Sequence, residues 1–272
     1  MRKRTTRVTT LALAALAGVV AAGASGAGGA IGIGRMMVLP NMVTAGSSGN
    51  ELTFTFLADS SSLRGQTIVD VPRGWSAPQR ANPSAPGFVE VKAGGCDAST
   101  RIVSIRSRRL TIATSCGRRR SYQLLYHNAT APTITADGYI FLAQTRSTAA
   151  GRKAKYRPLG RRKQPIVKVR GGPAAALYVG APGVGVAGTA FGLTVRAIDA
   201  YGNNAYPYLA TVSFASSDPA ATLSGPYTYV PTDAAQHVFE GTILRTPGAQ
   251  VITATDSNGL TGQSAPITVV AG

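Results

Sequence analysis

Alternation of apolar and polar residues with a period of two is the feature that most limits what this chain can fold into. Residues 52–56 read Leu, Thr, Phe, Thr, Phe, and residues 122–127 place Tyr, Leu and Tyr at every second position. A period of two is typical of a β-strand with one buried face. No stretch of the sequence sustains the 3.6-residue apolar period of an amphipathic helix. We therefore predict an all-β protein.

Further strands are predicted from β-rich runs that end at turn residues. Arg101–Arg106 and Arg109–Thr114, joined at Ser107-Arg108, are typical of a hairpin. Tyr139–Ala143 is short and fully apolar, so we expect it to be a central strand. Six more strands are predicted in the C-terminal part: Phe191–Ile198, Thr211–Phe214, Tyr227–Val230, His237–Ile243, Gln250–Thr255 and Pro266–Val270. Many short strands with turns between them predict antiparallel β-sandwiches.

The N-terminus has the order of a secretory signal peptide. Four basic residues within positions 2–7 precede an apolar stretch from Leu11 to Ala22, and small residues follow. This stretch is shorter than the roughly 20 residues that a membrane-spanning helix needs. We assign residues 1–27 to a cleaved signal peptide; a retained membrane anchor is the alternative. The mature protein is then expected to be secreted, and to be extracellular or held non-covalently at the cell surface.

Charge divides the mature chain near Gly171-Gly172-Pro173. Residues 28–172 contain 22 Lys and Arg against six acidic residues, a net charge of +16. Residues 173–272 contain only Arg196 and Arg245 against five acidic residues, a net charge of −3. We expect two tandem immunoglobulin-like sandwich domains with these boundaries, the first basic and the second mildly acidic. An asymmetry of this size concerns solubility and partners rather than fold.

Cys96 and Cys116 lie just outside the two arms of the predicted hairpin, so pairing of the arms brings both to its open base. In an exported protein a disulfide is the natural interpretation. Free thiols, or a reactive cysteine assisted by His127, are the alternatives.

Two groups of segments carry a resemblance to bacterial surface proteins. The first group resembles an adhesin-like β-sandwich domain and comprises Gly46–Phe56, Val71–Gln79 and Pro86–Val89. The second resembles a filamin-type, bacterial immunoglobulin-like repeat and comprises Ala187–Phe191, Ala197–Asn203, Ser216–Pro219 and Ile252–Asp256. The resemblance implies a structural or adhesive role at the cell envelope. The first domain, however, carries far more Lys and Arg than a neutral spacer requires.

Basic residues concentrate at three places in the first domain: the predicted hairpin tip, the segment after Cys116, and residues 152–170, which contain no acid. The candidate anion-binding residues are Arg106, Arg108, Arg109, Arg118, Arg119, Arg120, Arg152, Lys153, Lys155, Arg157, Arg161, Arg162 and Lys163. Loops of a sandwich gather at its ends, so some of these residues are expected to converge.

The first hypothesis is a structural or adhesive module, and the alternative is that this surface binds anionic polymers, namely teichoic acid, acidic glycans or extracellular DNA. Lysine and arginine pair with phosphate or carboxylate oxygens and release counterions, so affinity falls with salt. Tyr156 is the one aromatic residue within the dense basic run, too few to infer base stacking, and nucleic acid is therefore only a non-specific partner. Two alternatives remain open: a solvated basic surface without a dedicated ligand, and binding to other surface proteins.

An enzyme is not expected. The chain has two cysteines and two histidines, which leaves little material for metal frameworks or catalytic constellations. A hydrolase that uses His127 or His237 is kept as a third hypothesis. We predict no catalytic residue, no metal and no cofactor.

Two further features have a structural interpretation. Asp199, Asn203, Asn204 and Asp218 form an oxygen-rich set, but their spacing matches no fixed calcium loop, and Asx-type turns are the preferred interpretation. Trp75 lies among prolines and is expected to pack in or at the rim of the core rather than to stack on a sugar.

Overall fold

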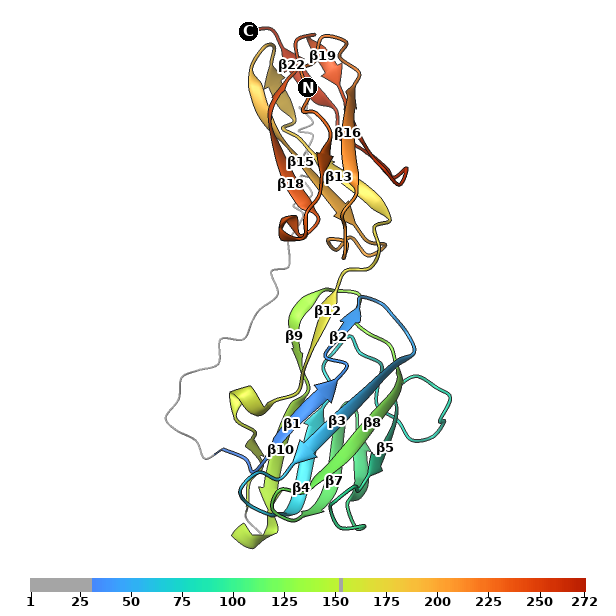
Figure 1. Ribbon diagram of the computed structural model, residues 1–272, viewed down its shortest axis with the longest axis vertical. Coiled ribbons are helices and arrows are strands. Elements are labelled where there is room, and N and C mark those ends of the chain that lie inside the picture. Colours follow the sequence, from blue (N-terminus) through green and yellow to red (C-terminus); the bar gives the residue numbers. More distant parts are fainter. Residues whose placement is uncertain (1–30, 152–153) are drawn as a thin grey trace, which may run out of the picture. The chain divides into compact units, whose positions relative to one another are not determined.

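The protein is described by a computed structural model that covers residues 31–151 and 154–272 (Figure 1). The predicted signal peptide lies outside these residues. Apart from three short 3-10 helices, η1 (Thr148–Ala150), η2 (Arg161–Lys163) and η3 (Pro231–Asp233), all regular elements of the described residues are strands. The all-β prediction is therefore confirmed. Among these residues, no helix has the length and apolarity needed to cross a membrane.

The first sandwich is built from residues 35–170. One sheet has the order β1-β3-β8-β5, with bounds β1 Arg35–Leu39, β3 Asn50–Leu57, β8 Ser121–Ala129 and β5 Phe88–Lys92. The facing sheet has the order β11-β10-β4-β7-β6, with bounds β11 Arg157–Pro158, β10 Leu142–Ser147, β4 Leu63–Asp70, β7 Arg109–Cys116 and β6 Arg101–Arg106. Figure 1 shows β10, β4 and β7 behind β1, β3 and β8. A small third sheet, β2-β12-β9, has bounds β2 Met42–Thr44, β12 Ile166–Arg170 and β9 Ala136–Ile140.

The core of this sandwich consists of the apolar side chains that occupy every second position of the strands and point inward. Phe54 and Phe56 of β3 are at most 1% exposed, as are Tyr122 and Tyr126 of β8. Each fully buried side chain of this size contributes about 2 kcal/mol of transfer free energy. Trp75 is 3% exposed and belongs to the same core, which confirms its expected packing role.

Two predicted strands are each divided between two sheets. The run 139–143 is not one central strand, because β9 ends at Ile140 and β10 begins at Leu142. At the break, the Phe141 N–H donates to the Pro165 carbonyl, and the ring enters the core 4.8 Å from Phe54. The run 250–255 is interrupted in the same way at Val251. Ile140 and Leu142 are 48% and 37% exposed, so the fully apolar run 139–143 indicated neither burial on both faces nor the position of the crossing.

The predicted hairpin and disulfide are both confirmed. Strands β6 and β7 pair antiparallel. Arg106 lies opposite Arg109 next to the turn, and Arg101 lies opposite Ala113 at the other end of the ladder. Cys96 and Cys116 form the disulfide at the open end, where their Cα atoms are 4.4 Å apart. Cys116 is 1% exposed, so the bridge ties the hairpin directly to the core.

Removal of the disulfide is expected to lower the free energy of unfolding of the first sandwich by about 3 kcal/mol, because the bridge closes a loop of roughly 20 residues. The test is the Cys96→Ala/Cys116→Ala variant, unfolded with urea and followed by the fluorescence of Trp75, the one tryptophan of the chain. Reduction of the unaltered protein should reproduce the loss. An unchanged urea midpoint in both experiments would contradict this expectation.

The second sandwich is built from residues 176–270 around a separate core. Its first sheet has the order β13-β15-β18, with bounds β13 Ala176–Gly180, β15 Ala190–Ile198 and β18 Gln236–Ile243. Its second has the order β17-β16-β20-β21, with bounds β17 Tyr227–Thr228, β16 Thr211–Ser216, β20 Ile252–Asp256 and β21 Thr261–Gln263. A third has the order β14-β22-β19, with bounds β14 Val184–Val186, β22 Ile267–Val270 and β19 Gly248–Gln250.

Pairing is not antiparallel throughout. Strand β12 pairs parallel with β2, and β22 pairs parallel with β14. Both exceptions occur in the small three-stranded sheets, while the large sheets of each sandwich are antiparallel. The two buried clusters share no residue: one draws on residues 36–169 and the other on residues 177–269. The domain boundary at 172/173 stays a prediction.

Candidate anion-binding surface

The three arginines of the hairpin tip have different surroundings. Arg109 is exposed and forms a bidentate ion pair with Asp70, with Nε–Oδ1 at 2.7 Å and Nη2–Oδ2 at 2.9 Å. Arg106, opposite Arg109 in register, is exposed and has no ion pair among the described residues. Arg108 instead points its donors at backbone carbonyls. The tip therefore offers Arg106 as a cation available to a ligand.

Arg108 acts as a clamp on the loop that follows β4. Its Nε donates to the carbonyl oxygens of Val71 and Pro72, at 3.0 and 3.1 Å. Its Nη2 donates to the carbonyls of Pro72, Trp75 and Ser76. All these acceptors belong to the segment that brings the Trp75 ring into the core. This structural role could not be predicted from the sequence, because nothing distinguishes Arg108 from the other arginines of the basic run.

A second set of candidates gathers around Asp59. Lys163 of η2 pairs with Asp59 at 2.7 Å, and Arg35 of β1 lies 3.5 Å from the same carboxylate. The turn that contains Arg118, Arg119 and Arg120 is attached there as well, because the Arg119 N–H donates to the Ala58 and Asp59 carbonyls. Arg161 and Arg162 are exposed on η2. Structure thus joins two predicted basic segments that are about 40 residues apart in the sequence.

The remaining candidates lie in the segment before η2. Arg152 and Lys153 lie outside the described residues, Lys155 is exposed, and Arg157 pairs in register with Thr145. Tyr156 is held on the outer face of the sheet: its hydroxyl donates to Gln66 Oε1, and its ring centroid lies 4.7 Å from the Arg146 guanidinium. Its ring is already engaged, so it does not offer a free stacking platform.

The pairing register of the strands brings together further arginines that were not among the candidates predicted from the sequence. In the sheet β11-β10-β4-β7-β6, every second residue of a strand faces away from the core. One row across the sheet reads Arg146, Gln66, Ala113, Arg101. The next outward row reads Gln144, Ile68, Thr111, Ser104, and the row beyond that contains Asp70, Arg109 and Arg106. Arg64 lies opposite Ser115 beyond the first row. We call the outward side of β10, β4, β7 and β6 the arginine face.

Between its arginines the arginine face has small or polar residues and the buried Ile68. Adjacent strands are about 4.8 Å apart, so Arg146 and Arg101 are separated by roughly 14 Å across the sheet. Central strand β7 contributes Thr111, Ala113 and Ser115 to the face. Small side chains there leave the flanking arginines accessible to an extended ligand lying on the sheet.

A hollow of about 370 Å³ lies at the edge of the arginine face. Its lining includes Arg64, Arg101, Ser99, Ser115 and Asp97. Hydrogen bonds with the side chain and backbone of Ser99 lower the pKa of Asp97, outweighing the opposite effect of desolvation; Arg64 favours the charged form as well. The hollow therefore presents a carboxylate and two guanidinium groups at neutral pH.

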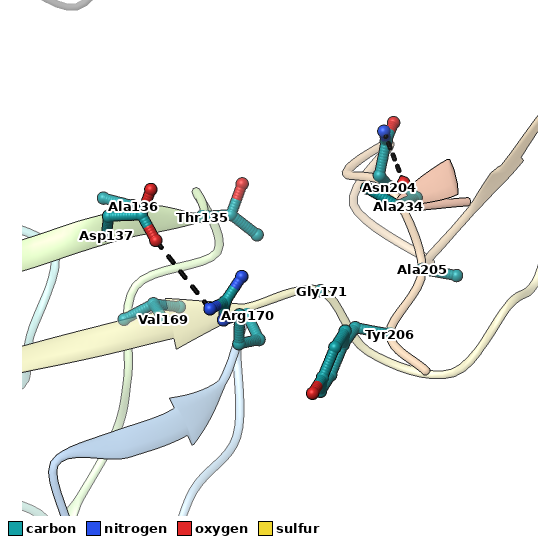
Figure 2. Close-up of a pocket in the computed structure, with 10 residues that line it drawn as sticks. All are labelled: Thr135, Ala136, Asp137, Val169, Arg170, Gly171, Asn204, Ala205, Tyr206 and Ala234. Atoms are coloured by element: carbon teal, nitrogen blue, oxygen red, sulfur yellow. Dashed lines mark hydrogen bonds and ion pairs between the residues drawn. The ribbon is translucent and has the colours of Figure 1, made fainter. Parts of the chain in front are cut away.

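A second hollow, of about 270 Å³, is lined by residues that include Arg170, Asp137, Tyr206 and Asn204 (Figure 2). The Arg170 Nη2 lies 3.9 Å from Asp137, and its guanidinium carbon lies 5.4 Å from the Tyr206 ring centroid. Asn204 donates to the Ala234 carbonyl. Asp137 opposes the one cation of this hollow, and none of the lining residues is a serine, cysteine or histidine.

The oxygen-rich set forms turns, as expected. Asp199 accepts hydrogen bonds from the backbone N–H groups of Gly172, Tyr201 and Asn203, all at 2.9 Å, and from the Asn203 amide. Burial raises the pKa of Asp199, but these bonds outweigh it and hold the pKa below its usual value. Asp218 lies elsewhere, beside Thr246. Within the described residues, no group of three His, Cys, Asp or Glu side chains is placed to hold a metal ion.

The two histidines contact acids and aromatic rings. His127 Nδ1 lies 2.5 Å from Glu51, and its Nε2 lies 3.5 Å from Glu90. His237 stacks on Tyr227 at 4.0 Å, with Nδ1 3.6 Å from Asp233. Neither contact supplies a nucleophile beside the imidazole, which the hydrolase hypothesis requires.

No protein-family model matches the sequence, and neither does any curated protein. Among solved structures, the Escherichia coli adhesin FdeC is similar with 13% identity and a TM-score of 0.42 over 89% of this chain and 65% of that one. The Yersinia pseudotuberculosis adhesin InvE is similar with 14% identity and a TM-score of 0.29, over 87% of this chain and 58% of that one. A Bacteroides uniformis β-glucuronidase has 10% identity and a TM-score of 0.29, over 86% of this chain and 25% of that one.

The first two are bacterial adhesins. This chain spans less than two thirds of either adhesin structure. At these levels of similarity, neither the adhesins nor the glucuronidase indicates a ligand, a partner or a reaction for this chain.

Proposed function

We propose that the mature protein is a secreted, non-enzymatic module of the cell envelope or extracellular space, and that its basic first sandwich binds anionic polymers. In this proposal residues 28–172 and 173–272 are two domains: the first binds, and the second acts as a spacer or contacts another surface protein.

The observation that carries the proposal is the arginine face. Five arginines project from four neighbouring strands, and the acids beside them are Asp70, which is engaged by Arg109, and Asp97. Gathered cations raise the local potential and attract polyanions, because each contact releases counterions from the polymer.

Salt-dependent retention of the mature protein on cell walls of the producing organism is the expected result. Binding at low ionic strength should be lost between about 50 and 200 mM salt, since several phosphate or carboxylate contacts act together. The measurement is the fraction of the mature protein that sediments with purified walls across a salt gradient. If the protein fails to sediment with the walls at every salt concentration tested, anion binding is overturned. The alternative is then favoured, in which the basic surface is only solvated and the protein adheres to other proteins.

A further inference from the structure

We propose that the arginine face binds an acidic polysaccharide, with Arg64, Arg101 and Arg106 pairing with its carboxylate or sulfate groups. This rests on the proposed function and specifies both its site and its ligand. Other basic groups of the same sandwich, on η2 and on the turn after β7, are then not part of the site.

The three arginines are suited to this task because their guanidinium groups are exposed and are not held in an ion pair among the described residues. Arg109 is engaged by Asp70, and Arg146 donates to Gln66 Oε1 at 2.5 Å. A guanidinium group binds carboxylate or sulfate oxygens through two parallel donors, which fixes orientation as well as adding affinity. Arg101 Nη1 also donates to the Ser99 carbonyl, at 3.2 Å, but this neutral acceptor leaves the positive charge uncompensated. Cations without an acidic partner can therefore bind successive anionic groups of one chain.

The polar groups between the arginines favour a sugar polymer over a chain of phosphates. The hollow places the Asp97 carboxylate and the Ser99 and Ser115 residues beside Arg64 and Arg101. A carboxylate accepts hydrogen bonds from sugar hydroxyl groups, and the phosphodiester groups of a nucleic acid offer no such donors. Mixed acceptors and cations therefore match a ligand that carries both hydroxyl and acidic groups.

Nucleic acid fits the arginine face less well. Single strands bind to grooves in which bases stack on accessible aromatic side chains. Tyr156 is the one aromatic residue that the described contacts place on this face, and its hydroxyl and ring are engaged by Gln66 and Arg146. Without a stacking platform, binding of DNA is expected to rest on charge alone.

The test compares two variants of the mature protein with equal net charge. The first, Arg64→Gln/Arg101→Gln/Arg106→Gln, neutralises the face; the second, Arg118→Gln/Arg161→Gln/Arg162→Gln, neutralises three exposed arginines elsewhere on the same sandwich. Binding to heparin, to hyaluronan and to a single-stranded oligonucleotide is measured by calorimetry at several salt concentrations. Heparin carries sulfate and carboxylate, while hyaluronan carries carboxylate only. Trp75 fluorescence and the thermal midpoint check that each variant is folded.

The face variant is expected to bind heparin at least about tenfold more weakly and to show a shallower salt dependence, because it lacks three anion contacts. The matched variant should stay within about twofold of the unaltered protein. Binding of heparin but not of hyaluronan would assign the recognised group as sulfate, and binding of both would assign it as any acidic group.

Three results would overturn the inference, and they differ from failure of the proposed function. Equal losses in the two variants would mean that charge acts without a defined site. Loss only in the matched variant would place the site on η2 and the turn. Binding of the oligonucleotide as tightly as heparin would exclude selectivity for polysaccharide. If the unaltered protein binds none of the three probes at low salt, anion binding itself fails.

Discussion

Replacement of Arg108 by alanine is expected to lower the free energy of unfolding of the first sandwich by about 3 kcal/mol. The guanidinium donates to four backbone carbonyls between Val71 and Ser76, and it is the group that holds this loop against the hairpin. Alanine leaves these acceptors without a charged donor, and Trp75 at the end of the loop loses its fixed position. Arg108→Lys should recover little, since one ammonium group cannot reach acceptors spread along a loop.

The measurement is urea unfolding followed by Trp75 fluorescence, which also reports whether the ring becomes exposed in the folded variant. Arg106→Ala is the matched control: it removes the same side chain two positions earlier, from an exposed site, and should change the free energy of unfolding by less than about 0.5 kcal/mol. Similar urea midpoints for the two variants would show that the clamp is not a main source of stability.

Replacement of Asp218 by asparagine is expected to destabilise the second sandwich by about 3 kcal/mol. Asp218 is 2% exposed, and its carboxylate accepts hydrogen bonds from the N–H groups of Ala220, Arg245 and Thr246 and from the Thr246 hydroxyl. It thus joins the loop after β16 to the loop after β18. An amide in its place points its N–H groups at backbone N–H donors, so some of these donors lose their acceptor.

Asp218 also predicts a loss of stability in acid. Burial raises its pKa, but the hydrogen bonds from Thr246, Arg245 and Ala220 outweigh burial and hold the pKa far below the usual 3.8. A carboxyl with a depressed pKa in the folded state stabilises fully above its unfolded pKa, and the contribution disappears as the pH falls from about 4 towards the folded value. Asp199, whose pKa is lowered in the same direction, adds to the loss in the same pH range.

Thermal unfolding by circular dichroism between pH 2 and 7 tests this expectation. The unaltered protein should lose stability below about pH 4, and Asp218→Asn should be less stable at pH 7 but lose less on acidification. Glu240→Gln is the control, because Glu240 is exposed on β18 of the same sandwich. A variant with the unaltered pH profile would show that Asp218 does not determine acid sensitivity.

The period of two was sufficient to predict β3 and β8, which bury one face. The β-rich runs joined at Ser107-Arg108 predicted the β6–β7 hairpin, and the positions of the two cysteines beside it predicted the disulfide. None of these features could predict which strands become neighbours, because pairing joins residues far apart in the sequence: Arg64 lies opposite Ser115, and Arg146 opposite Gln66. Runs of charge in the sequence therefore do not show which arginines share one face of a sheet. Arg108 and Arg109 are adjacent in the sequence, yet one binds carbonyls and the other an exposed carboxylate.

The second sandwich has five acidic residues, and three of them, Asp199, Asp218 and Asp256, are at most 5% exposed. Their oxygens are occupied by the protein's own N–H and hydroxyl groups, so a basic molecule arriving from solution cannot reach them. Glu240 and the partly accessible Asp233 are what this half presents for contact ion pairs. The opposite formal charges of the two halves therefore do not imply self-association. The arginine face of another copy would find few accessible carboxylates on this sandwich, so it stays available to other ligands at high protein concentration.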